Sequence, residues 1–342
     1  MASFIDLNND QRREMVNTRQ RYQAWRNAVA REVGYRGSVV WEETKGQEYL
    51  LRSFYDEDGK RRQKSLGKRS PKTEALKQHF DSERKDATDS RKALDAILDR
   101  QAAVNRALGL GRVPLIAARI LRLIDKRGLL GGGLRVAGTN SLYCYEAACG
   151  VFVEAGITAT LDIDLLFDSR KRLHLVGNPD LPDDSLIQLL RLADRSFRRT
   201  RQSFRAENDE GYLVDLIKPM RNPPWRGERL AVGVADDIQA AEIEGLVWLE
   251  NAPAFEQTVI DERGYPLRSV ASDPRVFAIH KHWISTREDR EPLKKKRDRE
   301  QADTVAALVG NYLPNLPFDE SELRMIPRDV VDAALRSFTA GQ

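Results

Sequence analysis

The run TLDIDLLF, residues 160–167, holds two carboxylates inside an otherwise mostly apolar stretch. In a β-strand, residues two apart point to the same face, so Asp162 and Asp164 lie together while the apolar residues between them face the core. Two neighbouring carboxylates repel each other, and a divalent cation is the usual compensation on a mostly apolar strand. The run therefore predicts a strand that binds Mg²⁺. An edge strand with two solvated acids is the alternative.

A second apolar run, GYLVDLIKP at residues 211–219, has Asp215 as its single acid. A charged residue in the middle of an apolar strand needs a partner. If this strand lies beside the first, Asp215 completes a set of three carboxylates that can hold two metal ions for in-line phosphoryl transfer, and it can accept the proton of an attacking hydroxyl. An ion pair between Asp215 and a nearby Arg or Lys is the alternative.

Upstream, residues 134–148 read as a short strand (LRVA), a turn (GTNS) and a helix (LYCYEAA). Glycine at the turn lets backbone N–H groups approach a phosphate closely, and the following helix adds its positive N-terminal end. The pattern is typical of an anion cradle, with ordinary helix capping as the alternative. No lysine of a P-loop is present, so a Walker A motif is excluded.

The order of Gly138-Thr139-Asn140, then Asp162-x-Asp164, then Asp215 is similar to the motif of the DNA polymerase beta superfamily of nucleotidyltransferases. The segments GTNSLYCYEAACG, TLDIDLLFD, DPRVFAIHKHWIS and REPLKKKRDREQA resemble, more closely, a bacterial nucleotidyltransferase-fold family of that superfamily. This resemblance covers about residues 100–310. Two features depart from the superfamily pattern: Thr139 replaces the usual Ser or Gly, and the spacing from Thr139 to Asp162 is longer than usual.

The resemblance implies roles for eight residues. Three would be catalytic and hold two Mg²⁺ ions, with Mn²⁺ as a substitute: Asp162, Asp164 and Asp215. Five would bind the nucleotide: Gly138, Thr139, Asn140, Lys281 and Ser285. The last two lie four apart in a helix that Asp273-Pro274 begins, so they share a face. A surface lysine and an ordinary polar helix residue are the alternative for this pair. Arg297 and Asp298 are expected to help shape the cleft.

Charge is distributed unequally along the 342 residues. Residues 1–130 contain 28 Lys and Arg against 18 Asp and Glu, whereas residues 131–342 contain 28 against 34. This asymmetry predicts an N-terminal part that meets polyanions. Within it, residues 60–72 include seven basic residues and no acid, next to Trp41, Tyr49, Phe54 and Tyr55, and could grip a phosphate backbone and stack bases. The candidate nucleic-acid-binding residues are Arg61, Arg62, Lys64, Lys68 and Arg69. A solvated hairpin face is the alternative.

Local patterns complete the expected N-terminal module. Residues 8–33 contain no Gly or Pro and predict a surface helix. Short strands are expected at 38–41, 48–54 and 63–66, with turns at Lys45-Gly46 and Asp58-Gly59. Ser70-Pro71 predicts the start of a long helical segment, with room for breaks, that runs toward residue 127. Further on, the arginine-rich tract 191–205 is expected to be the helix that joins the two acidic strands.

The chain is thus expected to have an α/β (α+β) fold with a mixed-sheet core, in three domains. These are a basic N-terminal module at 1–128, a nucleotidyltransferase core at 129–220 and a mostly helical domain at 221–342 that closes the nucleotide cleft. No stretch approaches the ~18 uncharged apolar residues of a membrane helix, and the N-terminus lacks a secretion-signal pattern, so a cytoplasmic protein is predicted. Cys144 and Cys149 are too few for a disulfide scaffold and are expected in the core.

The predicted reaction transfers a nucleoside monophosphate from an NTP, with ATP binding as the working expectation, to an acceptor hydroxyl and releases pyrophosphate. RNA is the favoured acceptor, with a tRNA 3′ end as the specific candidate. A toxin or phage-defence role with an antitoxin partner follows by analogy alone. The alternatives are a nucleotidyltransferase that acts on a protein or small molecule, and an inactive nucleic-acid-binding module.

Overall fold

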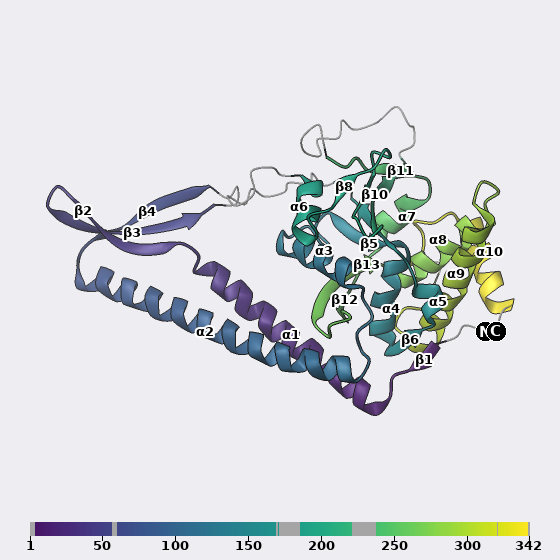
Figure 1. Cartoon of the computed structure of the whole chain (residues 1–342), viewed down its shortest axis with the longest axis horizontal. Coiled ribbons are helices and arrows are strands. Elements are labelled where there is room, and N and C mark those ends of the chain that lie inside the picture. Colours follow the sequence, from purple (N-terminus) through teal and green to yellow (C-terminus); the bar gives the residue numbers. More distant parts are fainter. Residues whose placement is uncertain are drawn as a thin grey trace.

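The computed structural model describes residues 4–56, 60–168, 170, 185–220, 237–319 and 321–340. They form a body built around a mixed β-sheet and a long arm that projects from it (Figure 1). The arm is formed by N-terminal residues, and the last helices lie on the side of the body that is far from the arm.

Two long helices, α1 (Asn9–Gly34) and α2 (Pro71–Ala107), lie side by side and form the shaft of the arm (Figure 1). Both begin with capping boxes, in which Asn8 and Ser70 accept hydrogen bonds from backbone N–H groups three residues on. Pro71 occupies the first turn of α2, where its missing N–H costs nothing. Both predicted helix starts are confirmed. The 37 residues of α2 span about 55 Å.

The far part of the arm is a three-stranded antiparallel sheet, β2 (Ser38–Thr44), β3 (Gln47–Tyr55) and β4 (Arg61–Lys68). The turn between β2 and β3 uses Lys45 and Gly46, both at positive φ, which glycine adopts without strain. The predicted meander is confirmed with longer strands. The predicted Asp58-Gly59 turn lies outside the described residues.

The sheet of the body is mixed, as the sequence predicts. Its strand order is β5 (Leu134–Ala137), β7 (Asp162–Phe167), β10 (Leu213–Pro219), β9 (Arg205–Glu207) and β8 (Arg198–Arg199). β7 and β10 run parallel, and the outer pairs are antiparallel. A short strand, β11 (Ala241–Ile243), pairs in parallel with the end of β10. The two acidic strands are therefore neighbours at the centre of the sheet.

Helices cover this sheet. They include α3 (Leu115–Lys126), α4 (Leu142–Cys149) and α6 (Leu186–Ala193), whose apolar side chains join those of β7 and β10 in one core. Cys144 is buried in this core and Cys149 packs against it.

The prediction of one helix over residues 191–205 is wrong. α6 ends at Ala193, because the Asp194 carboxylate accepts hydrogen bonds from the backbone N–H and hydroxyl of Ser196 and so favours a turn. Of the remaining arginines, Arg198 and Arg199 form β8 and Arg205 begins β9, with turns between these strands.

The rest of the body is mostly helical. A hairpin of β12 (Ala254–Ile260) and β13 (Pro266–Ser272) precedes the last helices, and β1 (Phe4–Asp6) pairs with β6 (Val151–Val153). The remaining elements are η1 (Gly138–Ser141), α5 (Ala155–Thr158), α7 (Leu246–Asn251), α8 (Pro274–Thr286), α9 (Pro292–Tyr312) and α10 (Arg328–Ala340). None of the helices in the described ranges has the length and apolar character needed to cross a bilayer.

The arm is fixed to the body through the turn between β12 and β13. The Asn105 side chain, fully buried in α2, donates a 2.8 Å hydrogen bond to the Gly264 carbonyl of this turn. Gly264 has φ +88°, and a Cβ atom there would collide with the carbonyl of Ala102. Glycine is therefore required for the helix and the turn to approach this closely.

We expect Gly264→Ala to loosen the arm, because alanine at this positive φ is strained by about 1–2 kcal/mol and must also push α2 away. Gly109→Ala is the matched control, since Gly109 also has a positive φ but has no atom within 4 Å of the place where a Cβ atom would lie. Denaturant unfolding and small-angle scattering should show a larger loss of stability and an altered arm position for Gly264→Ala. Equal losses in the two variants would contradict the close approach.

Candidate active site

Three carboxylates meet on the central strands. In the parallel pairing of β7 with β10, Asp164 and Asp215 are direct partners, and Asp162 is partnered by Leu213. Partners in register point to the same face of a sheet, and Asp162 shares that face with Asp164. Asp162 and Asp164 each keep part of their surface exposed, whereas Asp215 is buried. The side chains selected from the spacing of the sequence are therefore brought together.

Gly138 closes one side of this cluster. It follows β5, whose Ala137 is the antiparallel partner of Asp164, and it has φ +57°. A Cβ atom at residue 138 would collide with Asp164 Oδ2, so only glycine lets this turn lie against the carboxylate. The predicted order of strand, turn and helix is confirmed, with the turn formed as a 3-10 helix.

The electrostatics of the cluster are those of crowded like charges. Burial, followed by the negative charge of Asp162, raises the pKa of Asp164 to about 7, and Asp215 adds to the effect. Lys281 and Arg205 act in the opposite direction without cancelling it. In the metal-free protein, Asp164 is thus protonated in part at neutral pH, and a cation at this place would favour its ionised form.

Asp215 is paired with Arg205, its antiparallel partner on β9. Arg205 Nε donates to Oδ1 at 2.7 Å and Nη2 donates to Oδ2 at 2.6 Å, a bidentate pair. The alternative given for Asp215, an ion pair with a nearby arginine, is therefore also observed in this structure. By sequence, Arg205 belongs to a surface arginine tract, and only the strand register shows that it reaches the carboxylates.

These residues fit a divalent cation in chemistry. Within the described part of the chain, no three Asp, Glu, His or Cys side chains are already arranged to surround one ion. However, each carboxylate has about four acceptor positions, and Arg205 uses only two of those of Asp215. Mg²⁺ takes one or two carboxylates and completes its shell with water and phosphate, so Asp162, Asp164 and Asp215 supply a suitable donor set.

The turn after β5 is held by α9. The Thr139 hydroxyl accepts hydrogen bonds from Arg297 Nη2 at 3.2 Å and from Gln301 Nε2 at 3.1 Å, and Asn140 Nδ2 donates to the Asp162 carbonyl at 2.7 Å. Arg297 Nε, Gln301 Oε1 and Asn140 Oδ1 are buried and have no hydrogen-bond partner among the residues that the structure describes. Gln301 could not be identified from the sequence, because its contact with Thr139 joins residues that are far apart along the chain.

The side chains of Lys281 and Ser285, both on α8, have different contacts. Lys281 is buried and donates a 2.7 Å ion-paired hydrogen bond to Asp298, which also binds Arg290. Its positive charge also lowers the pKa of Asp164, in opposition to the effect of burial. The Ser285 hydroxyl donates to the His282 carbonyl of its own helix at 2.6 Å. The structure therefore brings Lys281 to the site electrostatically and shows no such link for Ser285.

The basic strand lies on the arm, apart from the carboxylates (Figure 1). Arg62 pairs with Asp56, Arg69 pairs with Glu48 and Glu74, and Arg61 donates to the Ser53 hydroxyl. Lys64 and Lys68 are exposed and make no ion pair with any described residue.

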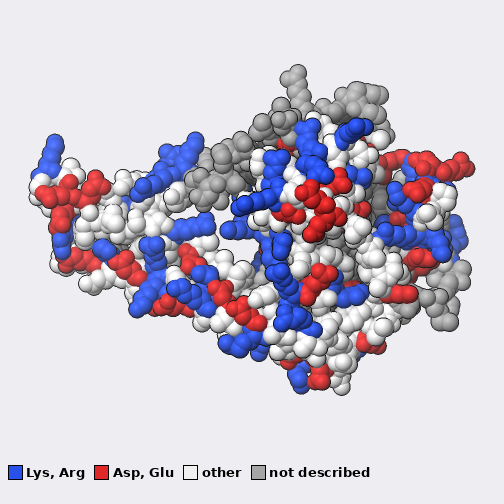
Figure 2. Space-filling view, viewed as in Figure 1, with Lys and Arg blue, Asp and Glu red and all other residues white. Residues whose placement is uncertain are grey.

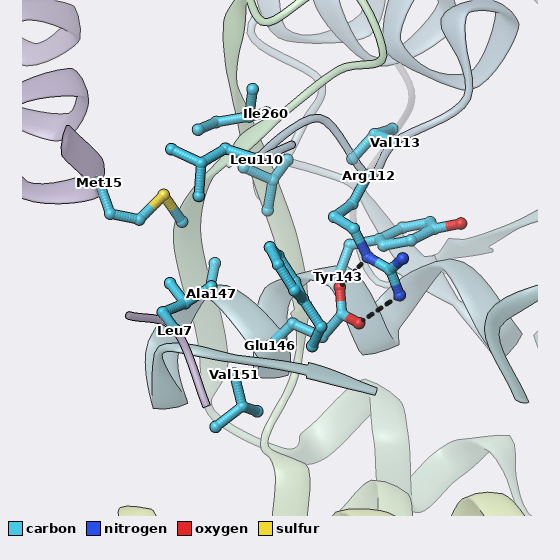
Figure 3. Close-up of a pocket in the computed structure, with 12 residues that line it drawn as sticks. Leu7, Met15, Leu110, Arg112, Val113, Tyr143, Glu146, Ala147, Val151 and Ile260 are labelled. Atoms are coloured by element: carbon cyan, nitrogen blue, oxygen red, sulfur yellow. Dashed lines mark hydrogen bonds and ion pairs between the residues drawn. The ribbon is translucent and has the colours of Figure 1, made fainter. Parts of the chain in front are cut away.

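A separate small pocket, of about 20 Å³, lies where the arm meets the body (Figure 3). Leu7, Met15 and Leu110 line it beside the Arg112–Glu146 ion pair. Arg112 also donates to the Val153 carbonyl, and Glu146 accepts from the Val153 N–H, so these charges are satisfied within the protein. None of the predicted site residues lines this pocket, which we interpret as part of the packing between arm and body.

Comparison with known proteins gives one match. Residues 116–327 match a family model described as Nucleotidyltransferase. The matched segment includes the three carboxylates, the turn after β5, and α8 and α9, and it begins after α2. No curated protein and no solved structure matches the chain.

We expect Mg²⁺ to raise the melting temperature of the wild type and Gly138→Ala to abolish this rise, because the added methyl group displaces the Asp164 carboxylate. Gly150→Ala is the control, since Gly150 has nearly the same φ but an open surrounding. Thermal unfolding with and without Mg²⁺ measures both. A full Mg²⁺ response in Gly138→Ala would show that this turn does not shape the cluster.

Asp164→Asn should stabilise the metal-free protein at pH 8. The pKa of Asp164 lies above its ordinary value of 3.8, so the fold disfavours the ionised form. The wild type therefore loses free energy of unfolding as the pH rises, because Asp164 ionises more readily in the unfolded state. This loss is absent below about pH 4, increases up to about pH 7 and stays constant above it. The melting temperature of the variant should exceed that of the wild type by a few degrees at pH 8, roughly 2–4 °C per kcal/mol, and should equal it near pH 4. A difference independent of pH would contradict the assignment.

Proposed function

The chain belongs to this nucleotidyltransferase family and is therefore a transferase, and we propose that it moves a nucleoside monophosphate from an NTP to an acceptor hydroxyl with release of pyrophosphate. The observation that carries this proposal is the register of β7 and β10, which pairs Asp164 with Asp215 beside Asp162. Membership of the DNA polymerase beta superfamily, use of ATP and a bacterial setting are part of the proposal.

In this proposal, Asp162, Asp164 and Asp215 hold Mg²⁺, or Mn²⁺ in its place. The metal, when bound, would polarise the α-phosphate and stabilise the charge of the leaving pyrophosphate. The acceptor oxygen forms a bond to the α-phosphorus as the bond to the bridging oxygen breaks. The proton of the hydroxyl passes to Asp215, whose orientation Arg205 fixes through both oxygens.

The nucleotide is proposed to bind between the turn after β5 and helices α8 and α9. Gly138 lets this turn lie directly against the Asp164 carboxylate, and the Thr139 and Asn140 side chains border the same turn. Lys281 supplies positive charge near the cluster, while Asp298 and Arg290 hold it in place. Ser285 is included as a nucleotide contact because of its place one turn after Lys281.

RNA is the proposed acceptor, and a tRNA 3′ end is the specific candidate. The support is the charge of the arm, where Arg61, Arg62, Lys64, Lys68 and Arg69 lie on or directly after β4. Transfer to a protein or a small molecule is the second candidate. A cytoplasmic, growth-inhibiting enzyme with a protein antitoxin is proposed by analogy only.

The test is incubation with each α-³²P-labelled NTP, Mg²⁺ and total bacterial RNA. We expect labelled RNA with the wild type and a reduction of at least about 100-fold with Asp162→Asn/Asp164→Asn, because loss of two metal ligands removes the electrostatic stabilisation of the transition state. Asp168→Asn is the control, since Asp168 follows the same strand and pairs with Arg170.

The other outcomes test the acceptor and the transfer reaction separately. Label on protein or on a small molecule would replace RNA as the acceptor. An NTP that stays intact with every acceptor would contradict nucleotidyl transfer itself.

A further inference from the structure

The arm sheet has two faces, and the shaft covers one of them. On this face Leu50 is fully buried, and Arg52, two residues further along β3, lies over the Phe80 ring of α2 at 4.3 Å. Trp41 is on the same face, because it is the strand partner of Leu50, and Arg69 lies over its ring at 5.2 Å. The side chains of this face therefore pack within the arm.

The opposite face is open to solvent and carries two tyrosines. Tyr49 and Tyr55 both lie on β3, and their even spacing points both side chains away from the shaft. Tyr55 is 48% exposed and Tyr49 is partly exposed. About 20 Å of strand separates the two residues. The sheet thus holds two accessible rings at a fixed spacing.

Each of these tyrosines lies directly opposite a basic residue of β4. Arg61 is the strand partner of Tyr55, and Lys68 is the strand partner of Tyr49. The second pair depends on a β-bulge between the two positions, because the extra residue turns Lys68 onto the open face. Lys64, before the bulge, is the partner of a residue on the shaft side. A ring beside a cation is therefore repeated at both ends of the open face.

The β4 side of the open face is polar and carries no acid. Gln63 and Ser65 lie between Arg61 and Lys68 on this face, and all four residues are exposed. Neither Arg61 nor Lys68 has an ion-pair partner among the described residues, although Arg61 Nε donates to Ser53 Oγ at 2.7 Å. Figure 2 shows Lys and Arg at the end of the arm sheet nearer the body, and Asp and Glu around the β2–β3 turn. An anionic chain is therefore expected to follow β4 rather than β2.

These side chains fit a single-stranded RNA. Separate rings beside cations bind the bases and phosphates of an unpaired strand, whereas the bases of a duplex are stacked on one another. A protein interface needs an apolar centre, but the buried Ser53, which Arg61 contacts, interrupts the apolar side chains here, and exposed Glu42 borders them. Gln63 and Ser65 offer hydrogen bonds to 2′-hydroxyl groups, which favours RNA over DNA.

We propose that the open face of the arm sheet binds a single-stranded segment of RNA, with bases stacked on Tyr49 and Tyr55 and phosphates contacting Arg61 and Lys68. The arm lies outside the segment 116–327 that matches the family, so this site belongs to the part of the chain that precedes the catalytic body. Identification of this RNA with the acceptor of the transfer reaction rests on the proposed function, whereas the binding itself does not.

The test measures binding by fluorescence anisotropy without NTP, with the full chain carrying Asp162→Asn/Asp164→Asn. The probes are a single-stranded RNA of about 12 nucleotides, the same RNA annealed to its complement, and a DNA strand of the same sequence. We expect the single-stranded RNA to bind about tenfold or more tighter than the duplex, with affinity that falls as salt rises. Equal or tighter binding of the duplex would overturn the proposal, and tighter binding of the DNA strand would overturn the assignment to RNA.

Two variants test the rings and the charge separately. Tyr49→Leu/Tyr55→Leu should weaken strand binding about tenfold or more, because both rings are lost while apolar side chains remain. Lys68→Gln should reduce the magnitude of the salt slope by about 0.7, the share of one phosphate contact on a single strand. Lys64→Gln is the matched control, since Lys64 is an exposed, unpaired lysine of the same strand on the opposite face.

Equal effects of Lys68→Gln and Lys64→Gln, or full binding by the tyrosine variant, would overturn the assignment to this face. The melting temperature of each variant, expected to match that of the parent, shows that the arm remains folded. Labelled RNA in the transfer assay without preference for a single strand would remove this inference and leave the proposed function. Strand binding that the tyrosine variant weakens, without nucleotide transfer by the wild type, would do the reverse.

Discussion

Repulsion among three carboxylates on two adjacent parallel strands is the constraint around which the body is organised. The register that pairs Asp164 with Asp215 forces like charges together in a partly buried place, and the raised pKa of Asp164 records the cost. Positive charge is supplied from separate parts of the chain, by Arg205 from the neighbouring strand and by Lys281 from α8. The fold thus holds an arrangement that a cation improves, which is what a site for a metal and a polyphosphate requires.

The groups around the carboxylates are themselves held in place. Asp298 is buried between Lys281 and Arg290, so the lysine cannot simply collapse onto the carboxylate cluster. Arg205 occupies both oxygens of Asp215 in a planar, bidentate contact. The cations that compensate the cluster are therefore restrained by their own partners, and their restraint leaves the exposed side of Asp162 and Asp164 free to receive a ligand.

The parts of this arrangement that depend on neighbours in the chain could be predicted from the sequence. Strand alternation places Asp162 beside Asp164, and Ser70-Pro71 marks a helix start, because both follow from local geometry. The Arg205–Asp215 pair could not be found, since it depends on which strands become neighbours and in what register. The helix predicted over the arginine tract is wrong for a local reason, because the Asp194 side chain competes with the helix for Ser196. The position of Arg69 over the ring of Trp41 could not be predicted either, since the two residues are far apart along the chain.

The arm depends on the body for its position, because the shaft has little apolar packing of its own. Thr18, Gln101 and Asn105 are buried between or beside its helices, where an unsatisfied amide would be costly. Thr18 and Gln101 both donate to Asn105 Oδ1, and Asn105 Nδ2 finds its acceptor only in the Gly264 carbonyl of the body. The last hydrogen bond of this network joins the shaft to the body. The buried polar groups of the shaft are therefore all hydrogen-bonded only when the two helices are in register and the arm is docked on the body. A surface at the far end of such an arm therefore keeps a defined position relative to the carboxylates.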